Sequence, residues 1–240
     1  MAFLQPAPSR QPIFNIPAVV IWLVAALAGV HLVLTLAPPS RADGWIEAYA
    51  FIPALFSTAF LAAHHIATPG LLDRALTFIT YMGLHNDFTH LAVNSLWLLA
   101  FGPVVARRFG AGLFLVFFLI CGVAGAAAYL ALNWGSPDPM IGASGAISGL
   151  MAAGLRLLPT LRPSSAAEPL LPVLSRQVVM FSLVWGVINI VAGVAGLGLG
   201  GESGAIAWQA HLGGYIAGLL LAGSFDAFRP QPVGVNLDPG

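Results

Sequence analysis

Six long apolar runs constrain the fold of this chain more than any other feature. A helix that crosses a bilayer needs about 20 mostly apolar residues. Runs near this length occupy residues 16–37, 88–106, 113–132, 144–158, 178–197 and 206–225. Charged residues make up only 8% of the 240 positions, whereas soluble domains carry about 25%. We therefore expect an all-α, polytopic membrane protein built as a bundle of six transmembrane helices.

The composition also excludes several classes of partner and chemistry. The formal net charge is zero and the chain has no lysine, so it offers no basic patch for nucleic acid. Cys121 is the single cysteine, which excludes an intrachain disulfide and a cysteine-based metal site. The zinc-protease motif His-Glu-x-x-His is absent, and no aspartate lies within the core of a predicted span. We expect no metal and no cofactor.

A long segment, residues 38–85, separates the first two spans. It contains an apolar run over residues 48–63, which is interrupted by Pro53 and ended by His64 and His65. This run is borderline for a span, and a helix lying in the membrane interface is the alternative.

The arginines orient the last five spans, because short loops that carry arginine stay on the cytoplasmic side. Six of them fall at one end of these spans: Arg107, Arg108, Arg156, Arg162, Arg176 and Arg229. The opposite, outer ends carry Ser144 in the fourth span and His211 in the sixth. His90 and Asn94 lie early in the second span, at the same level. Ionisable groups within spans usually mark a functional site.

Ser144 and His211 have the chemistry of a nucleophile and its base. Serine is a weak nucleophile and needs a base within hydrogen-bonding reach. Gly214 and Gly218 share a helix face with His211, so this span can approach a glycine-rich face of the fourth span closely. No acidic residue is placed to orient His211, so the arrangement would be a dyad. Taken alone, the motif around Ser144 favours the alternative that Ser144 is the N-cap of a glycine-rich packing helix.

His90 and Asn94 are four residues apart and therefore share one helical face. Facing the bundle, both could donate hydrogen bonds to a developing oxyanion. The backbone N–H of Ser144, at a helix start, could do the same. The alternative for Asn94 is a hydrogen bond that joins two helices.

Three motifs follow one another along the chain: His85-x4-His90-x3-Asn94, then Gly142-x-Ser144-Gly145, then Ala210-His211-x2-Gly214-x3-Gly218. In this order they resemble the rhomboid family of intramembrane serine proteases, over about residues 71–226.

The resemblance implies a role for each motif residue. Ser144 would be the nucleophile and His211 the general base. His90, Asn94 and the Ser144 backbone would form the oxyanion hole. The remaining motif residues would support the site: His85, Gly142, Gly145, Gly214 and Gly218.

The resemblance also bears on the fold. It implies that residues 38–85 form an interfacial loop, which favours six spans and a cytoplasmic N-terminus. In one respect the chain departs from the family. Many members carry an aromatic residue four positions after the serine, against the catalytic histidine, but Ser148 stands there. Support for the His211 ring must then come from elsewhere.

The expected function is hydrolysis of peptide bonds in or near transmembrane helices of single-span membrane proteins, within the lipid bilayer. One alternative is a catalytically inactive rhomboid-like protein that binds membrane helices. A small transporter is disfavoured because no internal repeat is visible.

The short N-terminus without a transit peptide favours a multi-pass protein of the bacterial inner (cell) membrane. We expect three parts: a short cytoplasmic segment over residues 1–15, a membrane domain over 16–228 and a polar, disordered tail over 229–240.

Overall fold

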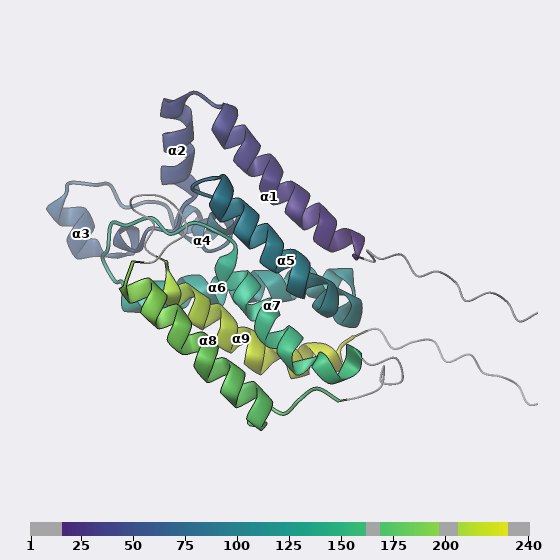
Figure 1. Cartoon of the computed structure of the whole chain (residues 1–240). Coiled ribbons are helices and arrows are strands. Elements are labelled where there is room, and N and C mark those ends of the chain that lie inside the picture. The colour runs from purple at the N-terminus through teal and green to yellow at the C-terminus, as the bar shows by residue number, and fades with distance from the viewer. Residues whose placement is uncertain (1–15, 162–168, 197–205, 230–240) are drawn as a thin grey trace, which may run out of the picture.

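The computed structural model describes residues 16–161, 169–196 and 206–229, and these ranges form a bundle of helices (Figure 1). The expected N-terminal segment, and all but the first residue of the expected polar tail, lie outside the described residues. Six helices occupy the six apolar runs: α1 (Ala18–Leu36), α5 (Phe88–Phe109), α6 (Ala111–Leu132), α7 (Ser144–Arg156), α8 (Arg176–Val194) and α9 (Trp208–Ala227). The predicted all-α membrane class is confirmed.

The six helices differ in how well each is suited to a bilayer by itself. By length and composition, α1, α5, α6 and α8 are long and apolar enough to cross a membrane. With 13 residues, α7 rises only about 20 Å, less than the roughly 30 Å thickness of the hydrocarbon core. The 20-residue helix α9 mixes glycines and polar side chains into its apolar sequence. These two helices carry the serine and histidine motifs.

The glycines of α7 and α9 bring the two helices into backbone contact. A Cβ atom at Gly214 would lie 2.0 Å from the carbonyl oxygen of Gly145, and one at Gly218 would lie 2.2 Å from that of Gly149. No side chain larger than hydrogen fits at either level. Close approach of this kind is how small residues join membrane helices, and it sets the depth of α9 relative to α7.

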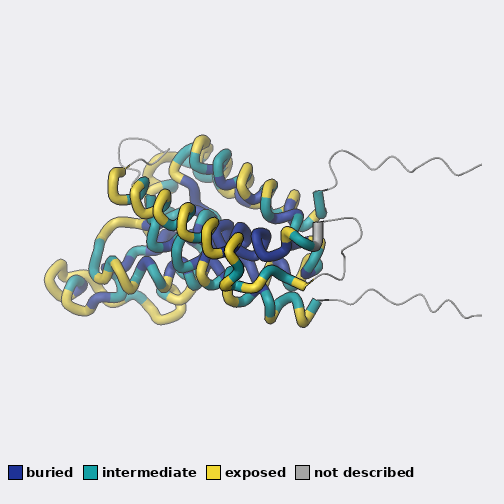
Figure 2. The backbone as a smooth tube through the Cα atoms, turned by 60° about the horizontal axis from the view of Figure 1, so that its bottom comes forward, coloured by how far each residue is buried: buried dark blue, intermediate teal, exposed yellow. Residues whose placement is uncertain are grey.

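Burial is concentrated around α7, in which twelve of thirteen residues are buried. Figure 2 shows the buried residues gathered inside the bundle, with exposed residues along the outer helices. In Figure 1, α8 lies at one edge of the bundle beside α9, and α1 lies at the other edge beside α5. A helix at the centre can hold a reactive group in a fixed position.

The segment between α1 and α5 is a chain of short helices. They are α2 (Pro39–Tyr49), the 3-10 turn η1 (Pro53–Phe56), α3 (Thr58–Ala63), α4 (Leu71–Thr80) and the 3-10 turn η2 (Tyr81–Gly83). The apolar run over residues 48–63 is therefore not one helix, because the chain is extended between α2 and η1 and again at Ser57. None of these pieces is long enough to cross a membrane. An interfacial position for this segment remains a prediction.

Arginines join the helix ends at the expected cytoplasmic side. Arg108 forms a two-pronged ion pair with Asp226 of α9, with nitrogen-to-oxygen distances of 2.6 and 3.1 Å. Arg156, at the end of α7, is buried and donates hydrogen bonds to the carbonyl oxygens of Leu171 and Leu219. The guanidinium of Arg156 thus satisfies backbone acceptors inside the fold.

Candidate active site

The loop before α7 is fixed to the segment that precedes α5. Phe51 and Met140 exchange two backbone hydrogen bonds, of 3.0 and 2.8 Å, in an isolated antiparallel bridge. The N–H of Gly142 donates to the carbonyl oxygen of Tyr81 at 2.9 Å. Gly142 has φ +111°, a conformation that a residue with a side chain rarely adopts. These contacts place Ser144 as the first residue of α7.

His211 meets Ser144 across the contact of α9 with α7. Its Nε2 atom lies 2.7 Å from Ser144 Oγ, which is hydrogen-bonding distance, and both side chains are half-buried. Gly214, one turn further along α9, is the residue whose missing side chain permits this approach. The geometry is that of a hydroxyl beside a base that can take its proton.

Asn189 of α8 is a polar contact of His211 that was not predicted from the sequence. The Oδ1 atom of Asn189 lies 2.8 Å from His211 Nδ1, on the side of the ring away from Ser144. Only an acidic residue was expected to orient the ring, and the sequence has none in a suitable position. A lone asparagine in the apolar run of residues 178–197 was the available signal, because polar side chains inside a span usually pair across helices.

Ser148 forms no hydrogen bond to His211 in the described part of the chain. Its hydroxyl donates a hydrogen bond of 2.8 Å to the carbonyl oxygen of Ser144, one turn earlier in α7. The side chain is buried and satisfied within its own helix.

His90 lies over the loop that leads to Ser144. A Cβ atom at Gly142 would lie 2.7 Å from His90 Nε2, so the imidazole rests directly against this glycine. Asp87, the N-cap of α5, accepts a hydrogen bond of 2.8 Å from the backbone N–H of His90 and fixes the start of the helix. His90 is thereby held beside the serine loop.

Asn94 is buried one turn further along α5. Its amide donates to the carbonyl oxygen of His90 at 3.0 Å, and its Oδ1 has no hydrogen-bonding partner in the described part of the chain. The amide has a second N–H to donate. Neither His90 nor Asn94 forms a hydrogen bond to Ser144 among the described residues.

His85 lies in the short connection between η2 and α5. Its ring meets that of His90 edge-on, with 5.0 Å between the ring centroids. Burial and, to a smaller extent, the neighbouring His90 lower the pKa of His85 to about 4. His85 is therefore neutral near pH 7 and can both donate and accept a hydrogen bond.

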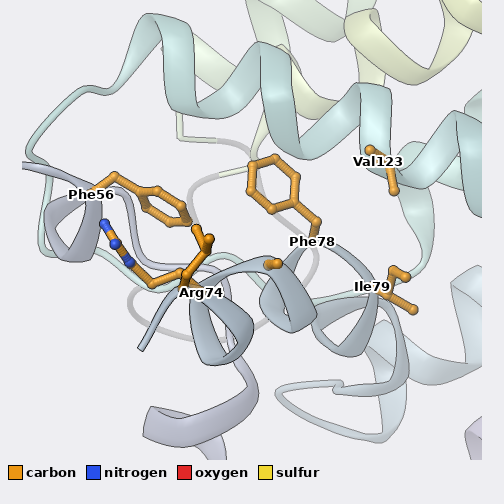
Figure 3. A pocket seen from close by; sticks show the side chains of 7 residues that line it. Phe56, Arg74, Phe78, Ile79 and Val123 are labelled. Atoms are coloured by element: carbon orange, nitrogen blue, oxygen red, sulfur yellow. The ribbon is translucent and has the colours of Figure 1, made fainter. Parts of the chain in front are cut away.

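A cavity of about 420 Å³ opens elsewhere, between η1, α4 and α6 (Figure 3). Its lining is apolar except for Arg74, whose guanidinium lies 5.9 Å from the centre of the Phe56 ring. Neither Ser144 nor His211 lines it. In the described ranges, no three histidine, cysteine, aspartate or glutamate side chains come together in a way that could hold a metal ion.

The sequence of this chain is similar to those of known proteins. The family model described as "Rhomboid domain" matches residues 73–225. The curated protein "Rhomboid protease GluP" of Bacillus subtilis (strain 168) is 34% identical over 159 residues, which is 66% of this chain. The match spans only 28% of the length of that relative. Both the Ser144–His211 pair and Asn189 fall within the residues that the family model matches.

Proposed function

The chain belongs to the rhomboid family, and on that premise we propose that it is an intramembrane serine endopeptidase. It would hydrolyse peptide bonds in or near the transmembrane helices of membrane proteins. The observation that carries the proposal is the 2.7 Å contact between His211 Nε2 and Ser144 Oγ inside a membrane-embedded bundle. A serine and a histidine are costly at that depth, and their contact suits a nucleophile and a base.

The first step would be attack by Ser144 Oγ on a backbone carbonyl carbon of the substrate. His211 Nε2 would take the hydroxyl proton as the new C–O bond forms. It would then return the proton to the leaving amine nitrogen when the C–N bond breaks. The product of this half-reaction is an ester of Ser144. Water, deprotonated by His211, would hydrolyse that ester and restore the hydroxyl.

The negative charge on the tetrahedral intermediate would be met by three groups. The N–H of Ser144 belongs to the first turn of α7, where backbone donors have no partner within the helix. His90 lies against Gly142, two residues before the nucleophile. Asn94 can turn its second amide hydrogen towards the same space. Donors fixed in advance stabilise such a charge without reorganisation.

The substrates that we propose are single-span membrane proteins. The arginine pattern favours an outer position for the Ser144 end of α7, so cleavage would occur near the outer interface. We propose the bacterial cell membrane as the location, supported by the bacterial origin of the relative.

A catalytically inactive, helix-binding member of the family is the second candidate. The observation in its favour is Ser148, which offers no aromatic ring to the His211 imidazole. Against it stands Asn189, which supports the ring through a hydrogen bond at His211 Nδ1. A protein that only bound helices would have no use for a serine hydroxyl held against a base.

The test is cleavage of single-span reporter proteins in liposomes. We expect the native chain to cut near the outer interface, and Ser144→Ala and His211→Ala to lose at least about 10³-fold in rate. Ser148→Ala is the matched control, because it removes a buried hydroxyl one turn away that is hydrogen-bonded to the Ser144 carbonyl oxygen and not to His211, and it should retain most activity. A fluorophosphonate should label the native chain and the control but not Ser144→Ala. Absence of both cleavage and labelling in the native chain would leave helix binding as the function.

A further inference from the structure

The orientation of the Asn189 side chain is fixed within its own helix. Its Nδ2 atom donates a hydrogen bond of 3.0 Å to the carbonyl oxygen of Trp185, one turn earlier in α8. A carbonyl oxygen only accepts hydrogen bonds, so the nitrogen of the amide must face Trp185. The amide oxygen, Oδ1, then faces His211 Nδ1 at 2.8 Å.

This orientation selects one form of the imidazole. An amide oxygen only accepts, so Nδ1 of His211 must carry the hydrogen and donate it. In the neutral ring the other nitrogen, Nε2, is then unprotonated and presents its lone pair to Ser144 Oγ at 2.7 Å. That is the form in which a histidine can accept the hydroxyl proton.

The contact between α8 and α9 keeps Asn189 in this register. The Ser182 hydroxyl lies 2.8 Å from the Tyr215 hydroxyl, and the Trp185 ring stacks on the Tyr215 ring with 4.2 Å between centroids. At the other end, the Trp208 ring lies against Gly193, where a Cβ atom would approach it to 2.3 Å. Asn189 lies between these contacts on one face of α8. Sliding α8 along α9 would have to break these contacts together with the one between Asn189 and His211.

From these contacts we infer that Asn189 is a positioning residue for His211, so that the site is a Ser144–His211–Asn189 triad. The inference rests on the proposed function. Asn189 holds the ring and its tautomer, and it also stabilises the positively charged imidazolium that forms when Ser144 attacks. An amide supplies the acceptor without placing a charge on a helix that faces lipid, where a carboxylate would be costly.

The test compares two replacements at position 189. Asn189→Leu keeps the approximate size of the side chain but removes the acceptor, whereas Asn189→Asp keeps an acceptor. We expect Asn189→Leu to lower kcat about 10-fold to 100-fold, the effect of one buried hydrogen bond to a charged group, with KM within about twofold. Asn189→Asp should recover part of that loss. Ser182→Ala, which removes a hydrogen bond from the same helix contact but leaves His211 untouched, should keep the native kcat.

Two kinetic results would overturn the inference. The first is a kcat for Asn189→Leu within about twofold of the native value. The second is an equal loss for Asn189→Leu, Asn189→Asp and Ser182→Ala, which would show that α8 acts only as a packed helix.

A second readout does not depend on cleavage. In protein labelled with ¹⁵N-histidine, the nitrogen shifts report which ring nitrogen is protonated, and the His211 signal is identified by its loss in His211→Gln. We expect hydrogen on Nδ1 in the native chain and a shift towards hydrogen on Nε2 in Asn189→Leu. An unchanged tautomer in the variant would refute the role of Asn189. If the native chain cut nothing, the proposed function would fail, and the tautomer would still decide the role of Asn189.

Discussion

Helices α7 and α8 both contact α9 and both contribute to the site, yet they are held in the molecule in different ways. In α7 every residue except Ser144 is buried, whereas in the 19 residues of α8 only Val178 is buried. The shorter helix contains three glycines in its 13 residues, and the longer one is rich in valine and isoleucine. The more apolar helix is thus the more exposed one.

The difference follows from the solvent. Lipid tails are as apolar as valine or isoleucine, so an apolar side chain gains little by leaving lipid for the interior of the bundle. Packing and close backbone approach decide which helix lies inside, and small residues permit both. The nucleophile is therefore placed at the start of the most buried of these helices, and Asn189 reaches the site from a helix attached along a single face.

The substitution with the largest expected effect disrupts the backbone contact between α7 and α9. Gly214→Ala would place a methyl group 2.0 Å from the carbonyl oxygen of Gly145, where only backbone can yield. We expect a loss of about 3 kcal/mol or more in the free energy of unfolding, from overpacking, together with loss of cleavage. The measurement is unfolding in mixed micelles, followed by tryptophan fluorescence.

Gly186→Ala is the matched control for this substitution on α8. A Cβ atom at Gly186 meets nothing within 4 Å, so the change should stay within about 0.5 kcal/mol. Equal losses of stability at the two glycines would contradict the difference in packing between the buried helix α7 and the exposed helix α8.

A second pair of substitutions makes the same change, leucine to alanine, once in α7 and once in α8. Leu150 of α7 is fully buried, whereas Leu183 of α8 has 60% of its surface exposed. Leu150→Ala should cost about 2–3 kcal/mol because it leaves a cavity, and Leu183→Ala should cost less than about 0.5 kcal/mol. The same unfolding measurement applies. A cost for Leu183→Ala that matched that of Leu150→Ala would mean that α8 is covered by protein on its outer face.

The smallest expected effect tests how α8 is attached. Ser182→Ala removes the 2.8 Å hydrogen bond to the Tyr215 hydroxyl, and such bonds between membrane helices contribute about 0.6 kcal/mol on average. We expect a loss of that size in the free energy of unfolding. A loss above about 2 kcal/mol would show that this hydrogen bond, instead of the whole α8 face, holds the helix in place.

The positions of the helices could be predicted because hydrophobic length acts locally along the chain. The run over residues 88–106 became α5, and the run over 144–158 became α7, with ends displaced by at most three residues. The site residues could be placed at one level for a related reason. Helix direction and arginine placement together decide which end of each span faces which side.

Asn189 could not be found in this way because its role depends on a pairing between helices. Sequence spacing shows which residues share a face of α8, but it does not show that this face meets His211 of α9. The breaks within residues 48–63 were only partly foreseeable for a similar reason. Pro53 indicates an interruption in the sequence itself. The extended residues between α2 and η1, in contrast, depend on the bridge from Phe51 to Met140.

The backbone contact of α7 with α9 has a consequence for how mutational tolerance should be understood in this protein. A survey of every substitution, scored by activity, would find Gly214 and Gly218 as intolerant as Ser144, because none of the three positions accepts a side chain of another size or kind. Loss of activity on substitution would therefore not distinguish residues that react from residues that only permit the close approach of α9 to α7. A chain that lost Ser144 but kept these glycines should still assemble the same bundle, so a preserved shape is no evidence of preserved chemistry.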